Sequence, residues 1–291
     1  MLPTHKTPRK QQLCDLTVLI HGPQKFGKSS LCAEAEGALF LATEPGLNSL
    51  EVFQQPIRTW DDLLCAAKEI ADGKHPFRTI VLDTVDNAYR MCAEYICLRK
   101  GVEHESDLEY GKGYALVNGE FYRVLNKLAL LPYGLFLISH SQDKEIETRT
   151  GKYTKVVPTL PEKASKFALG LVDVILFCDF EVITGPDGKP VHRRVLRTKP
   201  STAYEAGDRT RRLPEVLDCS YAAFAAAFEA TPSTPAAPAH EAEAPPVRPA
   251  AEPAANGSTP PLTRDAVRAS TPPTTTATGA AKPRSNPVPN R

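Results

Sequence analysis

The sequence predicts an α/β fold whose mainly parallel sheet is flanked by helices. Short apolar runs recur along the first 180 residues, and they show little of the alternation expected for a strand with one wet face. Helical patterns fall between these runs, an order typical of parallel sheets. The runs are LTVLI (16–20), ALFLA (38–42), TIVLD (79–83), GLFLIS (134–139) and VDVILFC (172–178).

Three helices and one hairpin complete this prediction. Thr59 precedes WDDLLCAAKEIA and can cap that helix, with Asp62 at the capping-box position. The other two helices are expected over 87–100 and 114–131. Further along, FEVITGPDGKPVHRRVLRT (180–198) places two extended runs around a Gly/Pro/Asp turn, which predicts an antiparallel hairpin at the sheet edge.

Composition divides the chain into parts. Its 291 residues suffice for one or two domains. From Thr231 onward the sequence is rich in Pro, Ala, Thr and Ser, holds 14 of the 27 prolines and lacks aromatic residues. Such a segment cannot bury enough apolar surface to offset its chain entropy, so 231–291 is predicted to be a disordered tail. A flexible N-terminus, 1–10, and one ordered domain, 11–230, remain.

Charge and cysteine content argue against a globally basic nucleic-acid-binding protein and against a disulfide-rich or zinc-binding one. The formal net charge is +1; without the tail's six basic and four acidic residues, the body has 35−6=29 Lys and Arg against 34−4=30 Asp and Glu. Any nucleic-acid contact must therefore come from a local patch. Seven cysteines without a C-x-x-C motif suggest reduced thiols in a cytoplasm. No signal peptide is expected, because the first residues, MLPTHKTPRKQQ, are polar. No apolar run approaches the ~20 residues of a membrane span, so no membrane partner is expected.

The residues after the first apolar run fit the phosphate-binding motif G-x-x-x-x-G-K-[ST]. We call residues 22–30, GPQKFGKSS, the phosphate loop. Its backbone N–H groups are expected to cradle phosphate oxygens at the positive end of the following helix. Lys28 would supply charge to the β- and γ-phosphates, and the Ser29 hydroxyl would bind Mg²⁺, so that ATP and Mg²⁺ are the expected cofactors. The expected nucleotide contacts are Gly22, Pro23, Gln24, Lys25, Phe26, Gly27, Lys28, Ser29 and Ser30.

Polar residues end three of the other apolar runs. Asp83 ends RTIVLD and is expected to hold Mg²⁺ through water; Asp86 is the alternative, although it falls past the strand end, and a helix N-cap is another role open to Asp83. Glu44 follows ALFLA, where a carboxylate over the nucleotide crevice could orient or deprotonate an attacking water. Ser139 and His140 end GLFLISH, where a polar side chain could touch the γ-phosphate and report its loss.

These motifs, in this order, resemble the RecA superfamily. There the phosphate loop is followed by strands that carry a catalytic glutamate, a metal-binding aspartate and a γ-phosphate sensor. More closely, residues 16–220 look like the phage-encoded, RecA-like ATP-binding proteins of the single-strand annealing (Sak) group. The other supporting segments are FLATEPGL, TIVLDTVDN, DLEYGKGY, LISHSQDKE, VVPTLPEKASKFALGLVDVILF and EAGDRTRRLPEVLD. One departure is that Ser139 and His140 stand where RecA has an Asn-Gln pair.

The resemblance implies a RecA-like P-loop ATPase core with Glu44, Lys28 and His140 as its catalytic residues. It further implies ATP-dependent action on single-stranded DNA in recombination, by annealing or strand pairing, as a homo-oligomeric ring or filament. Two other functions stay open: a P-loop small-molecule kinase and a non-catalytic, ATP-clamped DNA-interaction module. The kinase is disfavoured because no arginine-rich lid is evident between two core strands.

The segment after the sensor strand contacts DNA in RecA-type filaments, and here it is residues 142–158. Its basic side chains could neutralise phosphates and its tyrosine could stack on a base, whereas a solvated hairpin of mixed charge is the alternative. The candidate DNA contacts are Lys144, Arg149, Lys152, Tyr153 and Lys155. A second candidate is residues 109–123, with Tyr110, Lys112 and Tyr114, unless these tyrosines belong to the core.

A basic pair in RVLRTKP offers a contact between subunits. Arg197 and Lys199 are two apart and would share one strand face. By resemblance to RecA, one or both would reach the γ-phosphate bound to the adjacent subunit. An edge strand protected by charge is the alternative.

Overall fold

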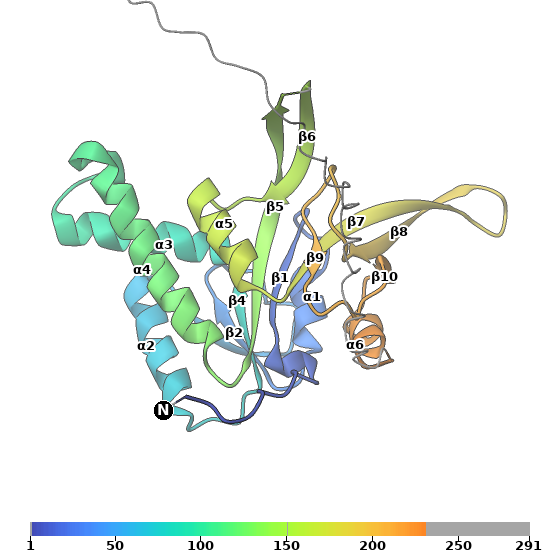
Figure 1. Ribbon diagram of the computed structural model, residues 1–291, viewed down its shortest axis with the longest axis horizontal. Helices are drawn as coiled ribbons and strands as arrows, with labels where there is room; N and C mark the ends of the chain where they lie inside the picture. Colours follow the sequence, from blue (N-terminus) through green and yellow to red (C-terminus); the bar gives the residue numbers. More distant parts are fainter. Residues whose placement is uncertain (1, 150, 231–291) are drawn as a thin grey trace, which may run out of the picture. The chain divides into compact units, whose positions relative to one another are not determined.

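The structure is a mixed α/β fold built on one sheet (Figure 1). The computed structural model describes residues 2–149 and 151–230; the predicted tail, 231–291, lies outside the described residues. The strands are β1 (Thr17–Gly22), β2 (Ala38–Ala42), β3 (Phe53–Pro56), β4 (Thr79–Asp83), β5 (Gly134–Thr148), β6 (Gly151–Pro158), β7 (Val174–Thr184), β8 (Pro190–Arg197), β9 (Gly207–Asp208) and β10 (Val216–Asp218). The α-helices are α1 (Lys28–Ala33), α2 (Trp60–Asp72), α3 (Val85–Lys100), α4 (Lys112–Ala129), α5 (Glu162–Leu171) and α6 (Tyr221–Ala230).

The strand order is β10-β8-β7-β1-β5-β4-β2-β3, with β6 paired to β5 and β9 to β7. The pairings among β1, β2, β3, β4, β5 and the start of β7 are parallel, and the others are antiparallel. The predicted α/β class with a mainly parallel sheet is therefore confirmed. The antiparallel hairpin is also confirmed as β7–β8. It was expected at the sheet edge, but the C-terminal residues of β8 pair with β10, which is the edge strand there.

The three expected helices are present, and side-chain caps mark the starts of α2 and α3; α4 begins and ends two residues earlier than predicted. Thr59 and Asp62 form the predicted capping box of α2. Helix α3 begins two residues before the predicted start, because Thr84 is its N-cap and accepts a hydrogen bond from the N–H of Asn87. The cap role considered for Asp83 therefore falls to Thr84.

Helices cover both faces of the sheet and create two hydrophobic layers. Helices α2, α3, α4 and α5 lie on one face, and α1 and α6 on the other (Figure 1). Neighbouring strand residues alternate between the layers, so that Leu82 packs with Trp60 and Phe121 whereas Val81 packs with Phe224. This double coverage explains why the strands are continuously apolar. Within the described ranges, no helix is long and apolar enough to cross a membrane.

One histidine of β1 is completely buried within this apolar setting. The Nε2 atom of His21 lies 2.6 Å from the carbonyl oxygen of Glu205, and its Nδ1 atom lies 2.8 Å from the hydroxyl of Ser141. A carbonyl only accepts, so Nε2 donates and Nδ1 of the neutral ring accepts from Ser141. Burial lowers the pKa of His21 to about 4, and the neutral ring joins β1 to β5 and to the segment before β9.

The burial of His21 predicts acid-sensitive stability. The unfolded histidine takes up its proton near pH 6.5 whereas the folded one does so only near pH 4, so the free energy of unfolding should fall as the pH drops through this window. A difference of about 2.5 pKa units corresponds to a loss of about 3 kcal/mol. Urea unfolding between pH 7 and pH 4.5 should show a shallower pH dependence for His21→Gln than for the wild type. The exposed control His192→Gln should follow the wild type, and parallel curves for His21→Gln and the wild type would contradict the assignment.

Candidate nucleotide site

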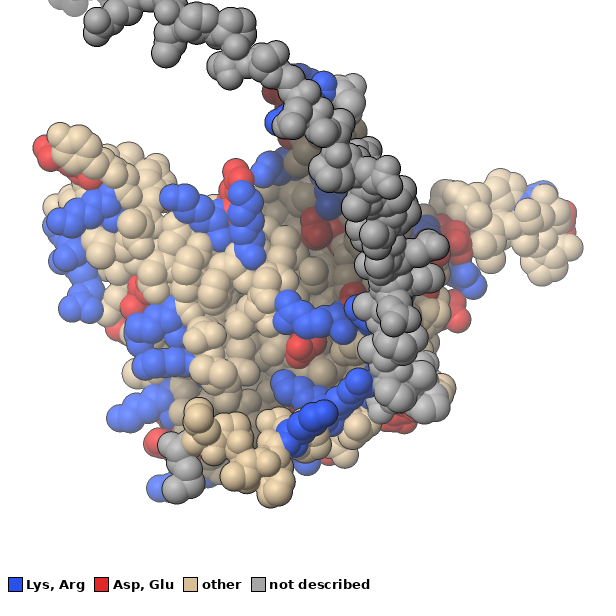
Figure 2. All heavy atoms as spheres, viewed as in Figure 1, with Lys and Arg blue, Asp and Glu red and all other residues tan. Residues whose placement is uncertain are grey.

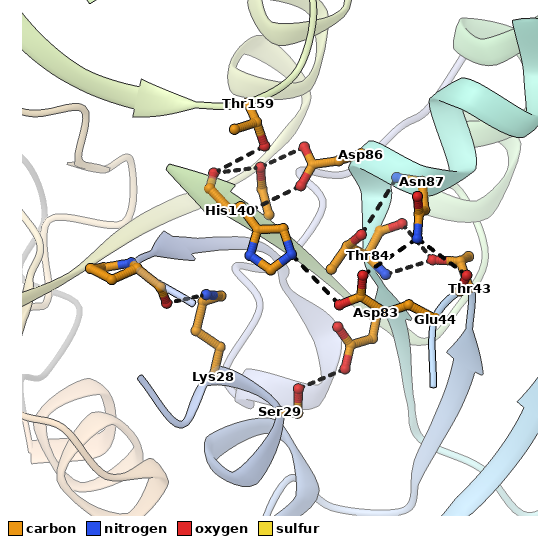
Figure 3. A network of polar contacts seen from close by, with 12 residues as sticks. Lys28, Ser29, Thr43, Glu44, Asp83, Thr84, Asp86, Asn87, His140 and Thr159 are labelled. Carbon is orange, nitrogen blue, oxygen red and sulfur yellow. Dashed lines mark hydrogen bonds and ion pairs between the residues drawn. The ribbon is translucent and has the colours of Figure 1, made fainter. Parts of the chain in front are cut away.

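The carboxyl ends of β1, β2 and β4 meet at one edge of the sheet beside the middle of β5, and these positions carry the predicted site residues. Strand β5 was expected to end at His140, but it continues to Thr148 because its outer half pairs with β6. Strand β5 lies between β1 and β4, and the register pairs Gly22 with His140 and Asp83 with Ile138. The chain leaving β2, which is also paired to β4, brings Glu44 to the same edge (Figure 3). Together with the phosphate loop, these ends enclose a cavity of about 400 Å³. Residues 24–30, Glu44, Asp83 and His140 line it, so the catalytic, metal and phosphate candidates share one pocket.

The path of the phosphate loop depends on its two glycines. Gly27 precedes α1 with a φ of 107°, a conformation that favours glycine. Gly22 packs against β7, where an added Cβ would lie 2.5 Å from the Cβ of Cys178. Backbone conformation at Gly27 and the close approach of β7 at Gly22 therefore favour glycine at both positions of the motif.

Lys28 lies beneath the loop and binds the loop's own carbonyls. Its ammonium group donates to the carbonyl oxygens of Gly22 at 2.9 Å and Pro23 at 2.7 Å. Burial lowers the pKa of Lys28, and the neighbouring Cys178 thiol and Asp83 carboxylate oppose that shift. Phosphate oxygens would compete with these carbonyls for the ammonium protons, so the charge is held where a polyphosphate would need it.

Ser29 and Asp83 form the pair expected of a magnesium site. The Ser29 hydroxyl donates to the Asp83 carboxylate over 2.7 Å (Figure 3). Burial raises the pKa of Asp83, and the bond from Ser29 partly offsets this. Hydroxyl and carboxylate oxygens are the ligands that Mg²⁺ prefers in proteins, and the pair faces the pocket that contains the phosphate loop.

Asp86, the alternative metal ligand, binds the middle of β5 instead. Its carboxylate accepts from the Ser139 hydroxyl and from the N–H of His140, both at 2.8 Å. Burial raises the pKa of Asp86, and these hydrogen bonds counteract the rise. The geometry thus favours Asp83 for the metal, and it turns Ser139 away from the pocket that His140 lines.

Glu44 is held at the pocket wall by two neighbours. Its Oε1 atom lies 3.6 Å from Nε2 of His140, and its Oε2 atom accepts from Nδ2 of Asn87 over 3.4 Å. Thr43 exchanges two hydrogen bonds with the backbone of Thr84, at 2.7 and 3.0 Å, and so joins the ends of β2 and β4. Sequence reasoning did not find Asn87 or Thr43, although Asn87 lies one helical turn after Asp83.

Comparison with known proteins shows the family of the chain. A family model described as an AAA domain matches residues 15–210, about two thirds of the chain. The chain belongs to this AAA-domain family of P-loop ATPases. It is also 25% identical over 166 residues to the SPbeta prophage-derived uncharacterized protein YorG of Bacillus subtilis strain 168. That match covers 55% of this chain and 49% of YorG, so it spans about half of the relative's length.

A solved structure is also similar to the chain at low identity. The flagellar accessory protein FlaH from Methanocaldococcus jannaschii aligns with a TM-score of 0.35 and 11% identity, over 70% of this chain and 85% of FlaH.

The predicted DNA-contact segment of this AAA domain is a paired β-hairpin formed by β5 and β6. Cross-strand pairing of Lys144 with Lys155 and of Ile146 with Tyr153 places these four side chains on one face. That face and α5 enclose a groove of about 490 Å³.

Glutamates neutralise several cations of the hairpin. Lys144 lies 3.7 Å from Glu162, and Lys155 lies 2.8 Å from Glu205. Lys152 is on the opposite face, 2.7 Å from Glu145, and Arg149 is exposed beside the turn. Mixed charge was the alternative interpretation of this segment, and DNA contact stays a prediction.

In the second candidate segment, residues 109–123, Tyr110 and Tyr114 lie at the surface, whereas Val117 and Phe121 further along are buried. The core alternative therefore does not hold for these two tyrosines, and DNA contact stays a prediction. Tyr110 is fully exposed with a φ of 55°, and Tyr114 is 40% exposed. Both flank Lys112, the first residue of α4.

The two predicted finger residues are engaged within the chain and do not line the pocket. Arg197 binds Asp179 at 3.0 Å, and Lys199 binds Asp208 at 3.2 Å. A contact with the adjacent subunit would have to replace these pairs, and it stays a prediction.

Asp86 should be important for stability, because it is the acceptor for two donors in the middle of β5. Asp86→Ala should lower the free energy of unfolding by about 2–4 kcal/mol, since the N–H of His140 and the hydroxyl of Ser139 lose a charged partner. Urea unfolding at pH 7 measures the change. The exposed control Asp143→Ala should shift it by less than about 0.5 kcal/mol; an equally small effect of Asp86→Ala would contradict the role assigned to Asp86.

Proposed function

We propose that this AAA domain binds ATP with Mg²⁺ and hydrolyses it, with Glu44 as the base. The observation that carries the proposal is the single pocket that contains the phosphate loop, the Ser29–Asp83 pair and the Glu44 carboxylate. Lys28 and the loop amides would bind the β- and γ-phosphates, and Ser29 and Asp83 would hold Mg²⁺. When bound, Mg²⁺ would offset the negative charge of the phosphates.

Glu44 fits the role of base because two neighbours orient it. Asn87 donates to one carboxylate oxygen and Nε2 of His140 lies beside the other, so the carboxylate has a defined position on the pocket wall. It would accept a hydrogen bond from water and take the water's proton as the oxygen attacks the γ-phosphorus. His140 would lie close enough to respond to the γ-phosphate, since it lines the same pocket.

We further propose that ATP controls binding of single-stranded DNA in recombination, by annealing or strand pairing. Support comes from β5, which continues without a break from His140 in the pocket to Lys144 in the groove. Lys and Arg side chains also gather over the helices beside this groove (Figure 2). The resemblance to Sak-group segments, and the prophage origin of the relative YorG, favour a phage-encoded protein of this kind. A ring or filament would allow Arg197 and Lys199 to act on the neighbouring subunit.

Replacement of Glu44 should separate hydrolysis from binding. Glu44→Gln keeps the size and one acceptor oxygen but cannot take a proton, so phosphate release should fall at least about 100-fold while the Kd for ATP changes less than about threefold. The exposed Glu51→Gln is the matched control and should behave as the wild type. Lys28→Ala should abolish both ATP binding and phosphate release.

Two outcomes would contradict the proposed hydrolysis. Phosphate release by Glu44→Gln at the wild-type rate would remove Glu44 from the reaction. Binding of ATP by the wild type without any hydrolysis would favour the clamp, and transfer of the γ-phosphate to a small acceptor, seen by thin-layer chromatography, would favour the kinase.

The groove face of the hairpin should carry the salt-dependent part of DNA binding. Lys144→Gln with Lys155→Gln should weaken binding of single-stranded oligonucleotides and reduce the slope of log K against log salt by about 1–1.5, because each lysine would neutralise one phosphate. Fluorescence anisotropy between 50 and 300 mM salt measures this slope. The exposed pair Lys68→Gln and Lys189→Gln, outside the groove, is the control. An unchanged slope, or an ATPase rate indifferent to single-stranded DNA, would refute the role of the groove.

A further inference from the structure

One cross-strand pair of the β7–β8 hairpin contacts Phe26 of the phosphate loop. Phe180 and Arg194 are register partners, so their side chains leave the same face of the hairpin. The Phe180 ring packs edge-on against the Phe26 ring, with centroids 5.0 Å apart. Nη1 of Arg194 donates to the carbonyl oxygen of Phe26 over 3.0 Å. A single loop residue is thus held by its side chain and by its backbone, and its exposed fraction is only 2%.

The bond from Arg194 sets the direction of a neighbouring N–H group. The carbonyl of Phe26 and the N–H of Gly27 belong to one planar peptide unit and point in opposite directions. With the carbonyl held toward Arg194, the N–H of Gly27 must face the other way. Nη1 lies 3.1 Å from the point where a Cβ of residue 27 would be, so the guanidinium also lies against Gly27.

Other carbonyls of the loop are held from within the loop and its helix. Lys28 binds the carbonyls of Gly22 and Pro23, and the N–H of Leu31 binds that of Gly27. The carbonyl of Phe26 takes its hydrogen bond from a strand 168 residues further along the chain. The orientation of this peptide unit therefore depends on the β7–β8 hairpin and not on the loop motif alone.

We propose that Arg194 and Phe180 are positioning residues that orient the peptide unit between Phe26 and Gly27 for phosphate binding. This inference rests on the proposed ATP site and deepens it. Cys178, two residues before Phe180 on the same face of β7, supports Gly22 at the start of the loop. The β7–β8 hairpin therefore supports the loop at Gly22 and Phe26, within one chain. We call the contacts of Arg194 and Phe180 with Phe26 the brace. Arg194 acts through the loop, in contrast to the contact between subunits predicted for Arg197.

Replacement of Arg194 tests the brace through nucleotide affinity. Arg194→Ala should raise the Kd for ATP and the KM about tenfold while kcat changes less than twofold, because a misdirected amide weakens binding of substrate and transition state alike. Arg194→Lys should recover most of the affinity, since an ammonium group can donate to the same carbonyl. Arg193→Ala is the matched control: Arg193 faces away, is paired with Glu181 at 2.7 Å, and should leave the Kd and KM within twofold of the wild type.

Hydrogen exchange tests the same brace without any nucleotide. In Arg194→Ala, amides of peptides covering residues 22–30 should exchange at least about fivefold faster than in the wild type, and those of Arg193→Ala should not. A wild type that binds no ATP would refute the proposed function, while the exchange of residues 22–30 would still decide the brace. Unchanged exchange in Arg194→Ala would overturn the inference. If the wild type binds ATP, an unchanged Kd for ATP in Arg194→Ala would overturn it as well.

Discussion

The nucleotide site depends on the parallel pairing of β5 between β1 and β4. This order places the ends of β1 and β4 on either side of His140, because parallel strands in register run to the same edge. Gly22 is paired with His140, and Asp83 with the residue two before His140, so the phosphate loop and the metal candidate are held across one strand. A shift of one residue in either register would turn Asp83 or His140 to the other face of the sheet. The apolar layers on both faces prevent such a shift, since it would also exchange buried side chains between layers.

Burial and charge in the pocket favour joint binding of a divalent cation and a polyphosphate. Lys28 has Asp83, Asp86 and Glu44 in its field, and burial raises the pKa of both aspartates. Three carboxyl groups around one ammonium leave an excess of negative charge that a divalent cation would offset. The loop amides and the helix N-terminus contribute the positive potential that phosphates require. A divalent cation and a polyphosphate together would balance these charges better than either alone, and Ser29 and Asp83 face the same cavity as the phosphate loop.

The sequence predicted those parts of the site in which local spacing determines geometry. The phosphate motif fixes Lys28 and Ser29 relative to their glycines, and β2 was predicted to the residue because both of its faces are covered. The short edge strand β3 was missed, since its residues are exposed and its sequence, FQQP, carries no apolar run. The roles of Asn87 and Arg194 were also missed. Each depends on pairing between segments far apart in the chain, and no local pattern records that register.

The continuity of β5 gives a physical route from the pocket to the hairpin. A paired strand resists bending, so a displacement of His140 would be passed along the backbone to Lys144 rather than absorbed by a flexible joint. Two further contacts stiffen the base of the hairpin. The carbonyl of His140 accepts from the N–H of Thr159, just after β6, and Ser141 is bonded to the buried His21. Because the carbonyl of Glu205 binds His21 and its carboxylate binds Lys155, the groove and the phosphate-loop strand share one polar connection through Glu205. A movement of His140 driven by the terminal phosphate would therefore have to alter the hairpin as a unit.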